Sequence, residues 1–325
     1  MSNLKKYFSN LHVLEYPQKS GFFCKGKGWQ IYFESNSSNH TLVDEQGDPH
    51  KEIIIYATSR ERAQYVANLI MASRCLYTGD LLTEEERTVF PKRAQTIEEI
   101  EEQLIVGGHD YIGVSDLPVS CLIAAKASHQ YKYQHAIFKY FLSLRTMPIN
   151  SLALDPQHDW IPGKAVSMSP KEHVFYASAI SLCYSVFEEL ALEVRASKEK
   201  PRIIDGKWNP EIKNDLERRL ISARINLKEK LLWTLRETPT KIERTRKPPG
   251  TQTEWVRYRV RDEYWNVIDA IAYASWLRSK IATHKLPAIA KSLSIYDVAN
   301  VQHLARRLLL ETLGFWRYYQ KHPSL

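Results

Sequence analysis

The sequence predicts a mainly α-helical protein, in which a four-helix bundle follows a smaller α+β domain. Start signals for long helices recur through the second half of the chain, whereas strand patterns are confined to roughly the first 60 residues. Prolines cluster between the two halves, at Pro148, Pro156 and Pro162. We therefore expect an α+β domain over residues 1–155 and a helical bundle over residues 165–325.

The strand patterns come first. Trp29–Phe33 and Glu52–Tyr56 are rich in aromatic and β-branched residues, and the turn residues of Asp44–Pro49 lie between them. The segment Gly21–Gly28 matches seven positions of a phosphate-binding loop, but its eighth residue lacks the hydroxyl that magnesium requires. Because a strand pattern follows this segment in place of a helix, we interpret it as a hairpin turn. A nucleotide-responsive regulator that uses the segment is the alternative.

Helix signals follow the strands. Ser59 is an N-cap for a helix that extends to about Tyr77. Thr96–Glu99 is a capping box, and Gly107–Gly108 ends the short helix that it opens. The long apolar and aromatic stretch Leu117–Leu144 is typical of one or two helices.

Four long helices are predicted in the second half. Ser169–Glu172 combines a serine N-cap, a proline at the first helical position and a glutamate two residues later. Asn209–Glu211 and Ser294–Asp297 provide similar starts, and Pro287 ends the third helix. The predicted spans are about 170–194, 210–236, 255–283 and 294–319, with a loop over 238–252.

Composition excludes several classes of protein. No apolar run approaches the roughly 20 residues of a membrane span, and no apolar segment follows Lys5 and Lys6 as in a secretion signal. The four cysteines are scattered, and the eleven histidines form no pair at metal-binding spacing. We expect a cytoplasmic protein with free thiols, without a metal ion or another cofactor.

The net charge of +8 is unevenly distributed. Up to Trp160 there are 16 Lys and Arg against 19 Asp and Glu, a net charge of −3, and the remainder carries +11. A basic second half favours a polyanionic partner. A solvated basic surface is the alternative.

Arg278 and His284 form the candidate catalytic pair, at the predicted end of the third long helix. An arginine holds phosphate oxygens with a planar fork, and a histidine transfers protons near neutral pH. RNA self-cleavage needs these two groups, one to move the 2′-hydroxyl proton and one to neutralise the phosphorane, and needs no metal ion. The alternative is an ordinary helix end, where basic residues contact the last carbonyls.

Helix geometry sets a condition on this pair. Six residues of a continuous helix turn by about 600°, so the two side chains would face apart. They converge only if the helix loosens before His284 or if a second subunit brings its own pair alongside. The proximity of Pro287 favours loosening.

The segment resembles the signature of a known family, the HEPN domains. Leu277–Ala282 followed by His284 is similar to the "LRSKI…H" pattern of many members, including the ApeA-like branch of phage-defence proteins. The resemblance covers about residues 165–325. Two positions depart from the pattern: Lys285 stands where many relatives have glycine, and Leu286 stands where toxins silenced by adenylylation have tyrosine.

The resemblance implies a metal-independent endoribonuclease that works as a homodimer, with Arg278 and His284 of both copies in one composite cleft. Ser279 would support the arginine, and Glu188 or Glu189 would orient it. Such proteins serve as anti-phage effectors or toxins, so the N-terminal domain would sense a phage trigger or a regulatory protein. A non-catalytic scaffold or nucleic-acid-binding subunit of a larger complex is the alternative.

A basic segment supports RNA as the partner. Arginines and lysines between residues 241 and 261 are interleaved with Trp255 and Tyr258, which suits phosphate contacts and base stacking along a single strand. A solvated loop before a helix with buried rings is the alternative. The candidate RNA-binding residues are Lys241, Arg244, Arg246, Lys247, Arg257, Lys280 and Lys285.

Overall fold

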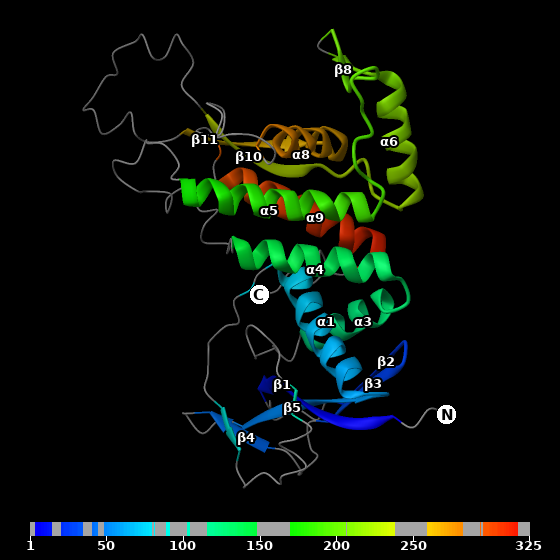
Figure 1. Cartoon of the computed structure of the whole chain (residues 1–325), viewed down its shortest axis with the longest axis vertical. Coiled ribbons are helices and arrows are strands. Elements are labelled where there is room, and N and C mark those ends of the chain that lie inside the picture. The colour runs from blue at the N-terminus through cyan, green and yellow to red at the C-terminus, as the bar shows by residue number, and fades with distance from the viewer. Residues whose placement is uncertain are drawn as a thin grey trace, which may run out of the picture. The chain divides into compact units, whose positions relative to one another are not determined.

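The computed structural model describes residues 4–14, 21–34, 41–44, 49–79, 81, 89–91, 103–104, 116–147, 170–205, 207–237, 259–281, 293 and 295–317. The described part of the chain is mainly helical, with a small β-sheet and two short hairpins (Figure 1). Two compact units are formed by residues 1–138 with 315–325 (unit 1) and by residues 139–314 (unit 2). The division falls within one helix, whereas the sequence led us to place it after residue 155.

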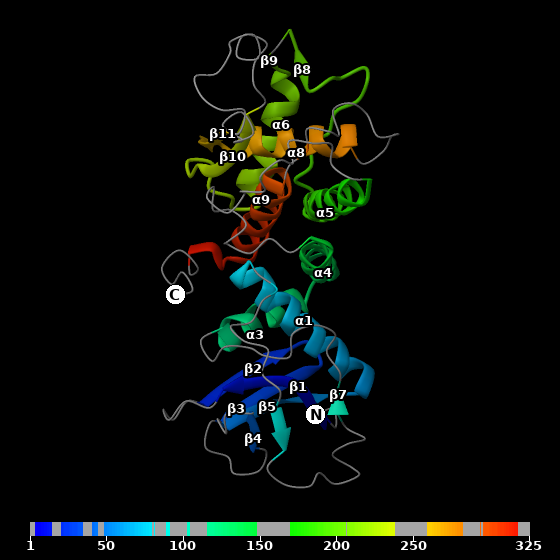
Figure 2. The same ribbon diagram turned by 90° about the vertical axis from the view of Figure 1, so that its left-hand side faces the viewer.

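Unit 1 combines a sheet with helices on one of its faces (Figure 2). The strand order is β2-β3-β5-β1-β7, β4 pairs with β5 and β6, and the β1–β7 pair is parallel. Ile31, Ile53 and Ile55 are fully buried beneath the helices. The elements are β1 (Lys5–Leu14), β2 (Gly21–Gly26), β3 (Trp29–Glu34), β4 (Thr41–Asp44), β5 (Pro49–Ala57), α1 (Arg60–Thr78), β6 (Val89–Pro91), β7 (Gln103–Leu104) and α3 (Asp116–Ala127). The next helix, α4 (Tyr131–Thr146), begins in unit 1 and belongs to unit 2 from Lys139 on.

The predicted hairpin turn of Gly21–Gly28 is confirmed by the antiparallel pairing of β2 with β3. Gly28 adopts a positive φ of 74°, which favours glycine at this turn. A Cβ atom on Gly26 would lie 2.2 Å from the buried Trp29 ring, so only glycine fits against this indole. The Lys27 N–H donates to the Ser128 hydroxyl at 3.0 Å, so this amide is already used within the fold.

The helix predicted after Ser59 is confirmed. The Ser59 hydroxyl accepts the Arg62 N–H at 3.2 Å, and Gly79 ends α1 in the left-handed conformation. The stretch 117–144, for which the sequence predicted one or two helices, forms two, α3 and α4. The short helix predicted from Thr96 is wrong at its end, because Gln103–Leu104 pairs with β1 as a strand; residues 92–102 and 105–115 lie outside the described residues.

The cysteines are free thiols, as predicted, and all four are buried. Burial raises the pKa of Cys24 to about 11, so this thiol stays protonated at neutral pH. The Cys24 thiol donates to the carbonyl of Cys121 at 3.4 Å within unit 1.

Unit 2 contains the four long helices of the second half, but two hairpins separate them (Figure 1). The helix predicted over 210–236 is wrong beyond residue 222, and the helix predicted over 255–283 begins only at Val267, because a strand precedes it. The loop predicted over 238–252 lies outside the described residues. The elements are α5 (Pro170–Glu189), β8 (Ile203–Ile204), β9 (Lys207–Trp208), α6 (Pro210–Ser222), β10 (Leu231–Glu237), β11 (Arg259–Trp265), α8 (Val267–Ile281) and α9 (Ile295–Leu313).

Three of these helices end where residues adopt left-handed conformations. Ala191 follows α5 with a φ of 57°, and Arg224 follows α6 with a φ of 66°. In both cases the next amide reaches back to a carbonyl of the last turn, from Leu192 to Phe187 and from Ile225 to Leu220. Neither position is a glycine, the residue that usually marks such a helix end in a sequence. After α9 the left-handed residue is Gly314. The predicted ends near residues 194, 236 and 319 are therefore too late.

The β10–β11 hairpin presents a ring cluster to α8. Trp233 and Trp265 stack with centroids 5.0 Å apart, and Tyr273 of α8 contacts both rings edge-on. The opposite edge of β10 is met by Asn300 of α9, whose side-chain amide exchanges hydrogen bonds with the N–H and C=O of Thr234 at 3.1 and 2.7 Å. Asn300 thus takes the place of a third strand at this position.

Helix α9 is buried along nearly its whole length and carries polar side chains into the core of unit 2. Arg307 is fully buried, and its Nε donates to Glu311 Oε1 at 2.8 Å. Glu311 Oε2 accepts the N–H of Asn226, and the Asn226 carbonyl accepts from Arg307. This cluster ties the segment after α6 to α9.

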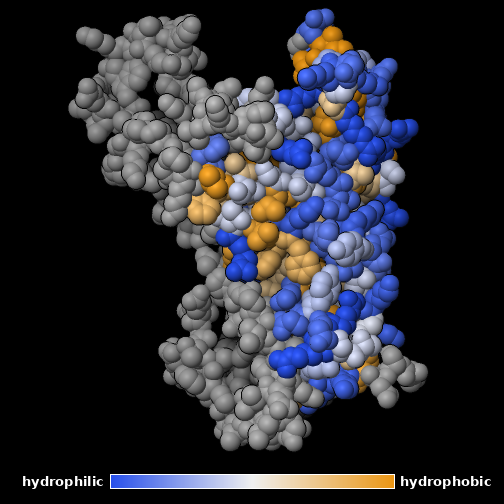
Figure 3. All heavy atoms as spheres, in the orientation of Figure 1, coloured by the Kyte–Doolittle hydropathy of each residue, from blue (hydrophilic) through white to orange (hydrophobic). Residues whose placement is uncertain are grey.

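Some apolar side chains remain at the surface of unit 2. On α5 the exposed fractions of Val174 and Phe175 are 59% and 39%, and apolar residues appear over this helix in Figure 3. Fully buried residues such as Phe187 lie on the same helix. The apolar residues of α5 thus extend beyond the side that packs against α9.

His303 of α9 makes the stability of unit 2 depend on pH. Burial, together with the charges of Arg306 and Arg307, lowers the pKa of His303 from 6.5 to about 4. Between these values the unfolded chain binds the proton and the folded chain does not, so stability falls as the pH falls. We expect wild type to lose about 2 kcal/mol relative to His303→Gln between pH 7 and pH 5. Urea unfolding of both proteins at each pH measures this; a constant difference would contradict it.

Candidate functional site

Arg278 lies in the last turn of α8 with its guanidinium at the surface. Its Nη2 atom is 3.0 Å from Glu188 Oε1, which α5 presents from its last turn. The side chains of Arg278 and Glu188 are 45% and 37% exposed. The neighbouring Glu189 instead pairs with Lys139 at 2.6 Å. Of the two acidic residues that the sequence left open, the structure therefore places Glu188 beside Arg278.

Tyr184 lies under the same guanidinium. The Arg278 Cζ atom is 5.1 Å from the centroid of the Tyr184 ring, within the range of a cation–π contact. Tyr184 is 3% exposed, and burial raises the pKa of its hydroxyl, so it stays protonated at neutral pH. Sequence reasoning missed this residue; the available signal is its position four residues before Glu188, on the same face of α5.

Ser279 is exposed next to Arg278. Its hydroxyl donates to the carbonyl of Trp276 at 2.9 Å, within its own helix. The structure thus brings Arg278, Glu188 and Tyr184 together, with Ser279 beside them on α8.

The other predicted site residues are not placed. His284, Lys285 and the five basic residues of the 241–257 segment lie outside the described residues. Lys280 belongs to α8, but its side chain is not among those described. Their proposed roles therefore remain predictions.

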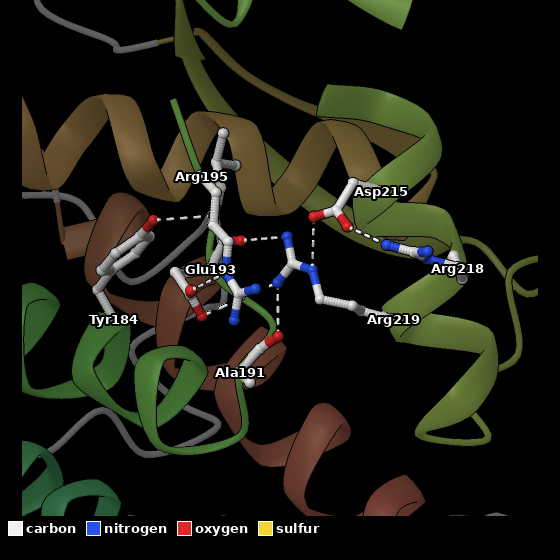
Figure 4. Close-up of polar contacts among 8 residues, drawn as sticks. Tyr184, Ala191, Glu193, Arg195, Asp215, Arg218 and Arg219 are labelled. Carbon is white, nitrogen blue, oxygen red and sulfur yellow. Dashed lines mark hydrogen bonds and ion pairs between the residues drawn. The ribbon is translucent and has the colours of Figure 1, made fainter. Parts of the chain in front are cut away.

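The segment that follows α5 is held by Arg219 of α6 (Figure 4). The Arg219 side chain is 13% exposed; its Nη2 donates to the Glu193 carbonyl at 2.9 Å and its Nη1 to the Ala191 carbonyl. Asp215 accepts from Arg219 Nε at 2.9 Å and fixes the guanidinium from its own helix. The next amide of the segment, Val194 N–H, donates to the Tyr184 hydroxyl at 3.3 Å.

Comparisons with protein-family models, curated proteins and solved structures find no match to this chain. Within the described ranges, no three His, Cys, Asp or Glu side chains gather in a group that could hold a metal ion. A search of the same ranges finds no helix with the length and apolar character needed to cross a membrane.

The geometry defines what this site can do chemically. A guanidinium has five N–H donors in a rigid fork, and one carboxylate engages only one edge of it. Because nearly half of the Arg278 side chain is exposed, its remaining donors can meet an anion from solvent. A phosphate group, with oxygens spaced to accept two parallel hydrogen bonds, is the ligand that suits such a fork.

Proposed function

We propose that unit 2 is a metal-independent endoribonuclease of the HEPN type. The observation that best supports this proposal is the position of Arg278, exposed at the end of α8 and held at one edge by Glu188 at 3.0 Å. Six residues further along the chain stands His284, so an anion-binding group and a proton-transfer group follow each other as the HEPN resemblance requires.

The proposed reaction is transesterification within RNA. A 2′-hydroxyl attacks the adjacent phosphorus, the new 2′-O–P bond forms, and the P–O5′ bond breaks. His284 takes the 2′-hydroxyl proton, and His284 of the partner subunit gives a proton to the departing 5′-oxygen. Arg278 neutralises the charge that develops on the phosphorane oxygens. The products are a 2′,3′-cyclic phosphate and a 5′-hydroxyl.

The proposal includes the assembly and the biological role. Helices α5, α6, α8 and α9 would form the HEPN-like bundle, and two copies would join as a homodimer with a composite cleft. Lys280, Lys285 and the basic residues between 241 and 257 would bind the RNA backbone. The protein would act in the cytoplasm as an anti-phage effector or toxin, controlled by a trigger or regulatory protein that unit 1 recognises.

A cleavage assay tests the activity. Wild type, His284→Ala and the control His129→Ala are incubated with total cellular RNA in EDTA; His129 is an exposed residue of unit 1. We expect wild type and the control to cleave RNA and His284→Ala to lose at least about 100-fold in rate, the usual contribution of a general acid or base.

The other outcomes separate the alternatives. Equal cleavage by all three proteins would remove the Arg278–His284 site from consideration. Salt-dependent RNA binding without cleavage would favour the non-catalytic scaffold. Toxicity on expression that His284→Ala relieves would instead indicate an enzyme that awaits its trigger.

A further inference from the structure

The ion pair with Glu188 is not sufficient to orient Arg278. Both side chains are more than one-third exposed, and exposed ion pairs are weak and readily exchanged with water. A phosphate bound to the remaining donors would also draw the guanidinium toward itself, and an exposed ion pair resists this only weakly. A second contact that does not use those donors is therefore needed to keep the plane of the guanidinium in place.

The ring of Tyr184 provides that contact. It meets Arg278 through its face, 5.1 Å from the centroid, and leaves the edges of the guanidinium available to phosphate oxygens. The ring itself is buried, is packed edge-on against Phe187 at 5.3 Å, and is hydrogen-bonded through its hydroxyl to Val194 N–H. Tyr184 is thus a rigid support beneath a partly exposed cation.

Arg219 acts on Tyr184 indirectly, through the segment that follows α5. The residues that lead to Val194 begin with the left-handed Ala191, and Arg219 binds the carbonyls of Ala191 and Glu193 (Figure 4). Because one mostly buried guanidinium crosslinks two carbonyls of this short segment, the position of the Val194 amide depends on α6. The described contacts run without a break from Arg219 to Tyr184 and from Tyr184 to Arg278.

We infer that Tyr184 is a positioning residue for Arg278, and that Arg219 keeps Tyr184 in place through the segment 191–194. The catalytic consequence rests on the proposed ribonuclease function, whereas the structural link does not. Neither residue touches the substrate in this scheme. Both act by keeping the guanidinium in the orientation that the phosphorane requires.

The structural link is tested without RNA, by the rate at which phenylglyoxal modifies Arg278, measured by mass spectrometry of its peptide. Tyr184→Met removes the ring face, and we expect modification of Arg278 to accelerate about three- to tenfold. Tyr184→Phe keeps the ring but loses the hydroxyl that accepts from Val194 N–H, so it should accelerate modification less than Tyr184→Met and about as much as Arg219→Gln. Arg219→Gln should accelerate modification, while the matched control Arg218→Gln, on an exposed neighbour that also pairs with Asp215, should not.

The catalytic consequence is tested in the same proteins by RNA cleavage. We expect Tyr184→Met to lower kcat about tenfold and to change KM less, because orientation matters most in the transition state. Wild-type modification rates in Tyr184→Met would overturn the inference. If circular dichroism shows that Tyr184→Met has lost its fold, the Arg219→Gln variant is used in its place. An Arg278 modification rate in Arg219→Gln equal to that in Arg218→Gln would overturn the inference. A faster rate would support it.

The two proposals fail in distinguishable ways. Faster modification of Arg278 in a protein whose wild type never cleaves RNA would support the positioning role and count against the ribonuclease. Cleavage by wild type that Tyr184→Met leaves unchanged would support the ribonuclease and overturn the positioning role.

Discussion

Under the proposed ribonuclease function, replacing Arg278 by alanine is expected to lower kcat/KM for RNA cleavage by about 10²–10³-fold, the usual effect of removing one preorganised donor from a developing oxyanion. Arg278→Lys should retain part of the activity, since it keeps the charge but loses the planar fork. Steady-state cleavage of a short fluorescent RNA by the full chain measures both variants.

The same substitution should barely change stability. The Arg278–Glu188 pair is exposed, so its loss should cost less than about 1 kcal/mol of unfolding free energy. Arg218→Ala is the matched control, because it breaks an exposed ion pair away from the site, with Asp215 at 2.7 Å. If Arg278→Ala instead destabilised the protein by several kcal/mol and left cleavage intact, Arg278 would be a structural residue.

The largest effect on stability is expected from Arg307→Ala. This side chain is fully buried, and its removal leaves Glu311 as a buried carboxylate without its cation. Removing one partner of such a pair costs about 3–5 kcal/mol. Urea unfolding followed by tryptophan fluorescence should show this loss, because Trp233 and Trp265 report on the same unit.

Two controls make the Arg307 prediction specific. Arg218→Ala breaks an ion pair whose arginine side chain is 79% exposed and should cost less than about 1 kcal/mol. The double variant Arg307→Met with Glu311→Met should recover part of the loss, because no buried charge then remains unpaired. Equal losses for Arg307→Ala and Arg218→Ala would show that the buried cluster contributes little to folding.

Local signals predicted the starts of helices well. Ser59 and Asn209 cap α1 and α6 in the structure because a side-chain oxygen reaches an amide two or three residues away. Such contacts depend only on neighbours in the chain. The turn at Gly28 was predictable for the same reason, since a positive φ favours glycine wherever it occurs.

The ends of helices and the hairpin of unit 2 could not be predicted in this way. Arg224 ends α6 in the left-handed conformation without being a glycine, and the run Leu231–Glu237 pairs with the distant run Arg259–Trp265. Its alternation of buried Leu231 and Trp233 with exposed Leu232 becomes visible only once β11 and α9 are in place. Residues 231–237 therefore form a strand because of a partner that is distant in the sequence.

The candidate site also combines features that the sequence determines with features that depend on long-range packing. The identity and spacing of Arg278 and His284, the scattered cysteines and the basic second half follow from the sequence alone, because they are properties of residue types and their order. The tertiary structure alone decided that Glu188 and not Glu189 meets Arg278, and that Tyr184 lies beneath it. Adjacent residues on a helix point about 100° apart, so the packing of α5 against α8 selects which of them reaches the arginine.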